Sequence, residues 1–196
     1  MCNEAARRIA LGQLRTDWGQ TRIPLHFPEG LPNMAPLDGF RITDATVIIR
    51  AADDGAELVT RRWSWPGAGG KPVYNFRSDG RSLDSFSSGG RCLIPVDSFY
   101  EFTVPTEPGR KRKDKWAFRL NGHHWFCIAG LWRADPTVGE AFTMLTCPPG
   151  PDVEPYHGRQ VVVLGRADWG RWLDPATPSA ALCRLLSAGS LSVVRA

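Results

Sequence analysis

The sequence predicts one α+β domain whose core is a curved, barrel-like sheet of mixed or antiparallel strands, with helices at the periphery. Three observations predict this class. The chain has 196 residues, enough for one well-cored domain and too few for two comfortable ones. It contains 20 Gly and 16 Pro, and this turn-rich composition is typical of many short strands with irregular connections. No internal repeat or linker divides the sequence, so we expect a single domain over residues 1–196.

Helices are expected near the two ends of the chain. Residues 4–18 carry apolar side chains, among them Leu11 and Leu14, at spacings that we interpret as an N-terminal helix. Residues 167–173 and 179–186 are interpreted as two further helices.

Strand signals fill the middle of the chain. Asp53-Asp54-Gly55 separates two apolar segments and predicts a hairpin, and Asn121-Gly122 predicts a second one. The expected strands are residues 45–50, 57–65, 73–77, 91–104, 116–120, 125–132, 141–146, 160–164 and 191–194. Residues 82–90 are rich in Ser and Gly and are expected to form a mobile loop.

The charge balance is basic, with a formal net charge of +4 and mostly Arg among the cations. Arg suits bidentate phosphate contacts, and the eight Trp are compatible with a nucleic-acid partner. A G+C-rich genome also favours Arg, so composition leaves the partner open. The run Arg110-Lys111-Arg112-Lys113 lies in a polar loop, and we interpret it as a solvated hairpin tip in preference to a phosphate clamp.

The cysteines and the apolar segments limit the class of protein. The five cysteines are odd in number and widely spaced, with no C-x-x-C, which argues against a disulfide framework and a zinc site. Neither a metal nor another cofactor is expected. No apolar run approaches the length of a membrane span, and the N-terminus lacks the apolar region of a signal peptide. A reducing cytoplasm is therefore the expected location.

Met1-Cys2 is the stretch with the most specific chemistry. Aminopeptidases remove Met1 when the second residue is small, and the product is a cysteine with a free α-amine beside its thiol. The amine titrates near pH ~8, so part of it is nucleophilic at physiological pH, and its ammonium form favours the thiolate. The amine condenses with an aldehyde to an imine, and the thiol closes a thiazolidine ring in an intramolecular step. Cys2 can also attack an acyl group as an N-terminal nucleophile.

Further polar residues are candidates for a site. Glu101 lies in an aromatic segment, so its carboxylate is expected either in a buried salt bridge or with a shifted pKa. His157 stands between a Pro-rich loop and an apolar strand, a place for acid–base work or for an ordinary surface histidine. Asn75 is either a turn residue or part of the site. Arg77 and Arg159 each lie two residues beyond a candidate and share its face on an extended backbone.

The motifs, taken in order, resemble the SRAP family, the SOS-response-associated peptidases that crosslink to abasic sites in single-stranded DNA. Met1-Cys2 opens the chain, and residues 91–102 match the most distinctive stretch of the family. The other matching segments are residues 33–36, 62–66, 75–79, 129–132, 143–146, 157–159 and 172–175. No single motif is conclusive, but their order together with a cysteine at position two is highly specific.

The resemblance implies a catalytic role for four positions. Cys2 bonds to the sugar, and Asn75 holds the α-amine and the sugar. Glu101 orients or deprotonates the amine and assists self-removal of Met1, which is an autoproteolytic peptidase step. His157 shuttles the proton that opens the deoxyribose ring into its aldehyde.

The resemblance also implies a DNA interface and a place in the SOS response. Arg77 and Arg159 would hold phosphates that flank the lesion, and Trp63 or Trp65 would stack on a base. The implied partner is single-stranded DNA that contains abasic sites, and a lyase activity on them is compatible with the family. The chain is expected to act as a monomer in the cytoplasm, at the nucleoid.

The sequence departs from the family pattern at several positions. Asn3-Glu4 stands where the family usually has Gly-Arg, which replaces a cation near the DNA with an anion. Asp79 stands for the usual Glu, Phe102 for the usual Trp, and the segment 76–90 is short. Because the four catalytic positions are retained, these departures bear on DNA affinity and strand preference more than on crosslinking.

Two other functions fit the same residues. A cysteine peptidase or N-terminal-nucleophile hydrolase would use Cys2 with His157. A non-catalytic module for single-stranded nucleic acid would use the aromatic residues and arginines and leave Cys2 inert. A DNA adduct that survives denaturant separates crosslinking from both.

Overall fold

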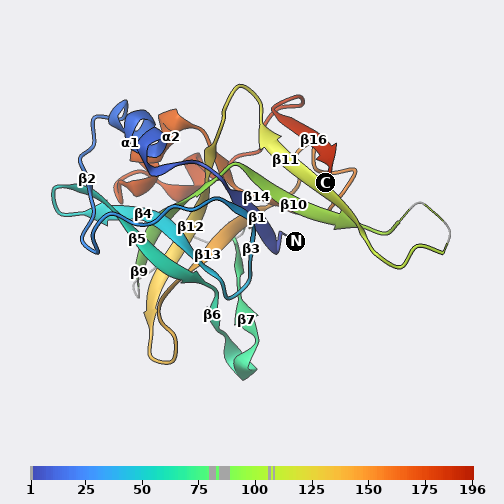
Figure 1. Cartoon of the computed structure of the whole chain (residues 1–196), viewed down its shortest axis with the longest axis horizontal. Helices are drawn as coiled ribbons and strands as arrows, with labels where there is room; N and C mark the ends of the chain where they lie inside the picture. Colours follow the sequence, from blue (N-terminus) through green and yellow to red (C-terminus); the bar gives the residue numbers. More distant parts are fainter. Residues whose placement is uncertain (1, 80–82, 84–88, 106, 108) are drawn as a thin grey trace.

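The computed structural model describes every residue except 1, 80–82, 84–88, 106 and 108, so most of the predicted 82–90 loop lies outside the described residues. Strands β4, β5, β13, β12 and β9 form a closed barrel in this order (Figure 1). Their bounds are Ala45–Ala52 for β4, Gly55–Trp63 for β5, Gly89–Val96 for β9, Phe126–Asp135 for β12 and Gly139–Cys147 for β13. Neighbouring strands are antiparallel except β5 and β13, whose parallel pairing closes the ring. The predicted barrel-like mixed sheet is therefore confirmed.

A second, antiparallel sheet has the order β16, β11, β10, β1, β3. Its bounds are Glu4–Arg7 for β1, Leu37–Arg41 for β3, Ser98–Thr103 for β10, Asp114–Leu120 for β11 and Leu191–Arg195 for β16. Asp97 alone separates β9 from β10, so the chain passes from the barrel to the second sheet at this residue. Its carboxylate accepts hydrogen bonds from the backbone N–H groups of Arg8 and Ile9, just after β1. The predicted single strand 91–104 is thus two strands in two sheets.

Short strands continue the barrel along both edges of β13. β8 (Asn75–Arg77) lies parallel to β13, with Asn75 opposite Met144. β14 (Gln160–Val161) pairs with the other edge of the same strand. The remaining short elements are β2 Leu25–His26, β6 Trp65–Pro66, β7 Pro72–Val73, β15 Val163–Leu164 and the 3-10 turns Ala68–Gly70 and Ser179–Ala181. The end of β13 therefore brings residues 75–77 and the segment before residue 160 close together.

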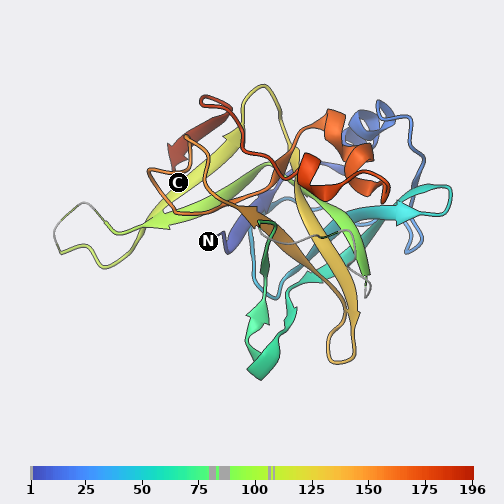
Figure 2. The same cartoon turned by 180° about the vertical axis from the view of Figure 1, so that it is seen from behind.

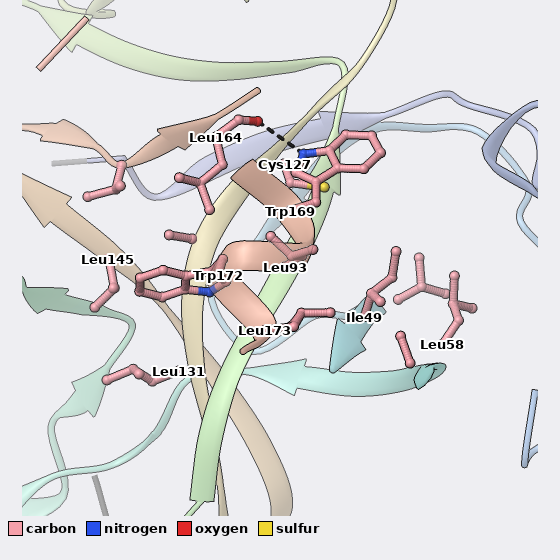
Figure 3. Packing of buried hydrophobic residues seen from close by; sticks show 14 of the residues in the cluster. Ile49, Leu58, Leu93, Cys127, Leu131, Leu145, Leu164, Trp169, Trp172 and Leu173 are labelled. Carbon is pink, nitrogen blue, oxygen red and sulfur yellow. Dashed lines mark hydrogen bonds between the residues drawn. The ribbon is translucent and has the colours of Figure 1, made fainter. Parts of the chain in front are cut away.

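The barrel strands bury side chains on both faces. On β9, Leu93 joins one apolar cluster, whereas its neighbours Cys92 and Ile94 join the other. The first cluster lies beneath the helices α1 (Leu11–Gly19) and α2 (Arg166–Leu173), as Figure 3 shows for α2. The second is shared with the β1–β10–β11 sheet and includes Cys2. The peripheral helices cover the face remote from Cys2.

Several predicted elements differ from the structure. Residues 4–7 form β1 and not a helix, because their backbone pairs with β3 on one side and β10 on the other, and Ala5 and Ala6 are fully buried there. Residues 179–186 contain one 3-10 turn in place of a helix. The segments 116–120 and 125–132 are strands but not a hairpin, because β11 pairs with β10 and β16, whereas β12 belongs to the barrel. The hairpin at residues 45–65 is confirmed as β4 and β5. In the described part of the chain, no helix is long and apolar enough to cross a membrane.

Candidate active site

Cys2 lies just before β1 and has 1% of its surface exposed. β1 runs antiparallel to β10, with Ala5 opposite Phe99, so the chain before β1 continues alongside Glu101. The Cys2 thiol donates to the carbonyl oxygen of Glu4 at 3.3 Å. Burial, reinforced by the charge of Glu101, raises the pKa of the thiol well above its ordinary value. With the first residue attached, the thiol is therefore neutral. The expected preference for the thiolate concerns the chain without Met1 and stays a prediction.

Glu101 lies on β10 beside Cys2 and is almost completely buried. Burial raises the pKa of its carboxyl group to about 7, although the positively charged amino terminus of the chain and, to a smaller extent, a hydrogen bond from the backbone N–H of Cys2 offset part of that effect. The carboxyl is thus close to half protonated at neutral pH, so it can accept or donate a proton. The nitrogen of Cys2 that it contacts is the atom that becomes the α-amine when Met1 is removed.

Asn75 holds Cys2 from β8. Its Nδ2 donates to the carbonyl oxygen of Cys2 at 2.8 Å. Within the described residues, the buried Oδ1 of Asn75 accepts no hydrogen bond. Because buried polar atoms in proteins are nearly always paired, this oxygen is a place for a donor supplied by a bound molecule or by the new α-amine. Asn75 therefore lies in a strand and contacts Cys2, and it is not a turn residue.

His157 lies at the same end of the molecule, in the segment that precedes β14. The preceding ring, Tyr156, packs on Trp116 and Phe118 of β11 at centroid distances of 4.9 and 5.4 Å. Trp116 is the neighbour of Glu101 in the β10–β11 pairing. Burial lowers the pKa of His157, and nearby positive charges that include Lys113 add to the effect. The imidazole is therefore neutral at physiological pH and can accept a proton.

Arg159 is tied into the protein by its guanidinium group. It pairs with both carboxylate oxygens of Asp79 and donates to the carbonyl oxygen of Thr146 at 2.9 Å. The Nδ1 of His157 lies 3.0 Å from both the backbone nitrogen and the backbone oxygen of Arg159. In this structure the predicted phosphate contact of Arg159 would have to compete with Asp79, and the arginine instead fixes the backbone that orients His157. Asp79 lies 80 residues away in sequence, and no local pattern links the two.

The other predicted DNA-binding residues divide into exposed and buried ones. Arg77 is exposed at the end of β8. Trp63 has no exposed surface, stacks on Phe142 and donates from Nε1 to the carbonyl oxygen of Tyr74 at 2.8 Å. Trp65 is 3% exposed and lies under the guanidinium of Arg133. Neither indole offers an open face, so the predicted base stacking by Trp63 or Trp65 does not fit this structure.

Glu4 is not the solvent-facing anion that the sequence suggests. Its carboxylate is buried and lies 2.6 Å from the Nζ of Lys115 and 3.3 Å from the Nε of Arg41. The Lys115 ammonium also lies 3.7 Å from the ring centroid of Tyr100. A Cβ at Gly39 would stand 2.4 Å from the Glu4 carboxylate, so glycine at this position makes room for it. The cluster anchors β1, which begins two residues after Cys2. It was not predicted from the sequence.

Comparison with known proteins gives relatives named for abasic sites. Over 89 residues the chain is 34% identical to the abasic site processing protein YobE of Bacillus subtilis (strain 168), a match that covers 43% of this chain and 39% of the relative. It is 33% identical over 89 residues to the abasic site processing protein YoqW of Bacillus phage SPbeta, covering 43% of this chain and 38% of that protein. The match thus spans less than half the length of these curated relatives.

Solved structures share the fold over the whole chain. A crystal structure of a protein from Bordetella bronchiseptica has a TM-score of 0.77 at 22% identity and covers 100% of this chain and 99% of its own. A protein from Bacteroides thetaiotaomicron has a TM-score of 0.70 at 15% identity, with coverages of 99% and 91%. At these identities the likeness concerns the fold alone. The family model for "SOS response associated peptidase (SRAP)" matches residues 1–194, and the chain therefore belongs to the SRAP family.

Proposed function

We infer that this protein traps abasic sites in single-stranded DNA through Cys2, as a covalent thiazolidine, after Met1 has removed itself from the chain. The observation that carries this function is the contact between the Cys2 nitrogen and Glu101, a carboxyl group whose pKa is about 7. This nitrogen is the leaving group when Met1 is hydrolysed and the nucleophile afterwards. The family membership and the names of the curated relatives support abasic sites as the target.

The reaction begins with ring opening. His157, neutral at physiological pH, exchanges protons with the sugar and releases the aldehyde of the abasic deoxyribose. The α-amine of Cys2 attacks the aldehyde carbon, and Glu101 takes the proton that the amine loses. Glu101 returns this proton to the aldehyde oxygen, which gives the carbinolamine, and then carries the second amine proton to the new hydroxyl group, which leaves as water and gives the neutral imine. The unpaired Oδ1 of Asn75 is a suitable acceptor for the amine hydrogens.

Ring closure completes the adduct. The thiol of Cys2 adds to the imine carbon, a C–S bond forms, and the thiol proton ends on the former imine nitrogen. No oxidant, metal or cofactor takes part. Because burial keeps the thiol protonated, the amine reacts first and the thiol second. The same raised thiol pKa is unfavourable for a cysteine peptidase, which needs a thiolate activated by histidine.

The proposed partner is single-stranded DNA with abasic sites, and the proposed place of action is the cytoplasm, at the nucleoid, with the protein as a monomer. A lyase activity would follow if the imine, before ring closure, lost the 3′ phosphate by β-elimination. Adduct stability is therefore measured together with strand cleavage.

The test is a denaturing gel of purified protein with a single-stranded oligonucleotide that contains one abasic site. We expect a band that survives denaturant, an intact mass that lacks one methionine, and loss of the band in Cys2→Ala. Cys183→Ala, which removes a half-exposed thiol elsewhere, is the matched control and should crosslink as the wild type does. An adduct formed by chains that retain Met1, or by Cys2→Ala, would refute the thiazolidine. DNA binding without any adduct would favour the other function considered, a non-catalytic module for single-stranded nucleic acid.

A further inference from the structure

The connection between β10 and β11 carries Arg110, Lys111, Arg112 and Lys113, all exposed. Figures 1 and 2 show this hairpin reaching beyond the barrel on the side where the N-terminus lies. Of the four cations, Arg110 lies 3.4 Å from the buried carboxylate of Asp114 and 3.7 Å from Glu107. Arg110 is thus paired within the hairpin. The sequence had instead predicted that the whole run is a solvated tip.

Arg112 faces the N-terminal segment. It lines a surface hollow of about 390 Å³ together with Asn3, Glu4, Arg41, Ile42 and Phe102. Glu4 does not cancel the charge of Arg112, because its carboxylate is already bound by Lys115 and Arg41. The cations around the hollow therefore outnumber its one carboxylate, and Asn3, the neighbour of Cys2, forms part of its wall.

Lys113, the next residue, acts on the other candidate group. Lys113 immediately precedes β11, whose Trp116 packs on Tyr156, the neighbour of His157. Its positive charge is one of those that lower the pKa of His157. Two consecutive residues of one hairpin thus place positive charge beside Asn3 and where it acts on His157. Arg159, by contrast, has its guanidinium bound to Asp79 and Thr146.

We propose that Arg112 and Lys113 bind phosphates of the single-stranded DNA that passes over Cys2, so that the β10–β11 hairpin is a phosphate-binding arm of the site. This inference rests on the proposed function. A strand whose abasic sugar reaches Cys2 passes the surface beside Asn3, where Arg112 lines the same hollow and Lys113 follows it in the chain. Arg77, exposed at the end of β8, supplies a further contact. The arm compensates for the cation that is missing at position 4.

The experiment measures binding of a labelled single-stranded oligonucleotide by anisotropy at several salt concentrations, in a Cys2→Ala background. We expect Arg112→Gln and Lys113→Gln each to lower the slope of log K against log salt by roughly 0.7, and the double variant by about 1.4. Arg110→Gln is the matched control, because it removes the same charge from the same hairpin at a residue already paired with Asp114. It should leave the slope nearly unchanged.

Adduct formation separates this inference from the proposed function. With Cys2 present, the double variant should still form the adduct but should need more abasic DNA for half-maximal rate. The phosphate-binding arm would be refuted by a double variant that keeps the wild-type slope, or by an Arg110→Gln protein that loses as much slope as Lys113→Gln. Crosslinking by the wild type would still support the proposed function in that case. A wild type that neither binds nor crosslinks abasic DNA would overturn both. Thermal unfolding of each variant confirms that the hairpin changes leave the fold intact.

Discussion

Glu101 combines two properties that conflict at the scale of one residue. Glu101 is buried, which favours the neutral form of its carboxyl group. It also contacts the nitrogen of Cys2, and only the charged carboxylate of Glu101 could take a proton from that nitrogen as a base. A pKa of about 7 keeps both forms populated at neutral pH, so one group can serve as base and then as acid in successive steps. Two predictions follow from this value, one for the reaction and one for stability.

The rate of adduct formation at saturating abasic DNA should rise as pH increases through about 7, because Glu101 must lose its proton to act as the base. His157 does not cause this rise, since its pKa is lowered and it is already neutral in that range. Glu101→Gln should lower the rate by roughly 10²–10⁴-fold and remove the rise near pH 7, leaving only the titration of the amine near ~8. A Gln variant with the wild-type pH profile would exclude Glu101 as the base.

The same carboxyl group should cost stability above neutral pH. Its pKa in the folded protein, about 7, lies above the ordinary value of 4.5, so the folded state binds the proton more tightly. The stabilising effect of that proton is complete below about pH 4.5 and is lost as pH rises to about 7. Glu101→Gln should therefore raise the free energy of unfolding at pH 8 by at most about 3 kcal/mol and leave it unchanged near pH 4. Urea unfolding at both pH values measures this, with the exposed Glu107→Gln as control.

The candidate residues that the structure brings together are those that the sequence grouped for a chemical reason. Cys2, Asn75 and Glu101 meet at the backbone of Cys2, whose carbonyl oxygen accepts from Asn75 and whose N–H donates to Glu101. Trp63 and Trp65 could not be placed, since an indole in a strand reads the same whether its face is open or buried. Their partners, Phe142 and Arg133, come from strands far along the chain.

At the scale of elements, β1 determines where Cys2 lies. Its sequence, Glu4-Ala5-Ala6-Arg7, has no β-branched residue and no alternation, so local propensity favoured a helix. Tertiary contacts override it: Ala5 and Ala6 fit between two strands, and the Glu4 carboxylate is held by Lys115 and Arg41. The first residues of a chain are poorly ordered unless tertiary contacts hold them, and the contacts of Glu4 with Lys115 and Arg41 hold β1 in this way.

Glu4→Gln should destabilise the protein by about 1–3 kcal/mol, because it removes the charge from hydrogen bonds with two cations. Hydrogen exchange should increase most in β1, and adduct formation should slow through poorer placement of Cys2. Glu57→Gln, which alters an ion pair with Arg50 on the barrel, is the control for stability without an effect on the N-terminus. Glu4→Arg, which restores the cation that the family usually has near this position, should destabilise β1 by placing a third cation beside Lys115 and Arg41. Unchanged exchange in β1 of Glu4→Gln would contradict the anchoring role.

At the scale of the whole molecule, the site depends on pairings between distant segments. The hairpin of β4 and β5 could be predicted because its turn is local, whereas the parallel pairing of β5 with β13 joins residues about 80 positions apart and left no sequence signal. The same closure brings β8 along β13, and with it Arg77 and Asp79 beside Arg159. The two arginines look equivalent in sequence, each two residues beyond a polar group, and the fold gives them different surroundings.

Because their surroundings differ, variants of Arg77 and Arg159 should have different effects on two measurements: the salt slope of DNA binding and the adduct rate at saturating DNA. Arg77→Gln should lower the salt slope of single-stranded DNA binding by roughly 0.7, because it removes an exposed phosphate contact, and should leave the adduct rate at saturating DNA unchanged.

Arg159→Lys cannot keep both the paired contact with Asp79 and the bond to Thr146. It should leave the salt slope nearly intact, slow the adduct rate at saturation, and shift the His157 titration seen by NMR, since the His157 ring is held by the backbone of Arg159. Asp79→Asn should reproduce the loss of rate, because it breaks the same clamp from the other side. If Arg159→Lys instead lowered the slope and spared the rate and the His157 titration, Arg159 would leave Asp79 to bind DNA, and its role as a phosphate contact would be restored.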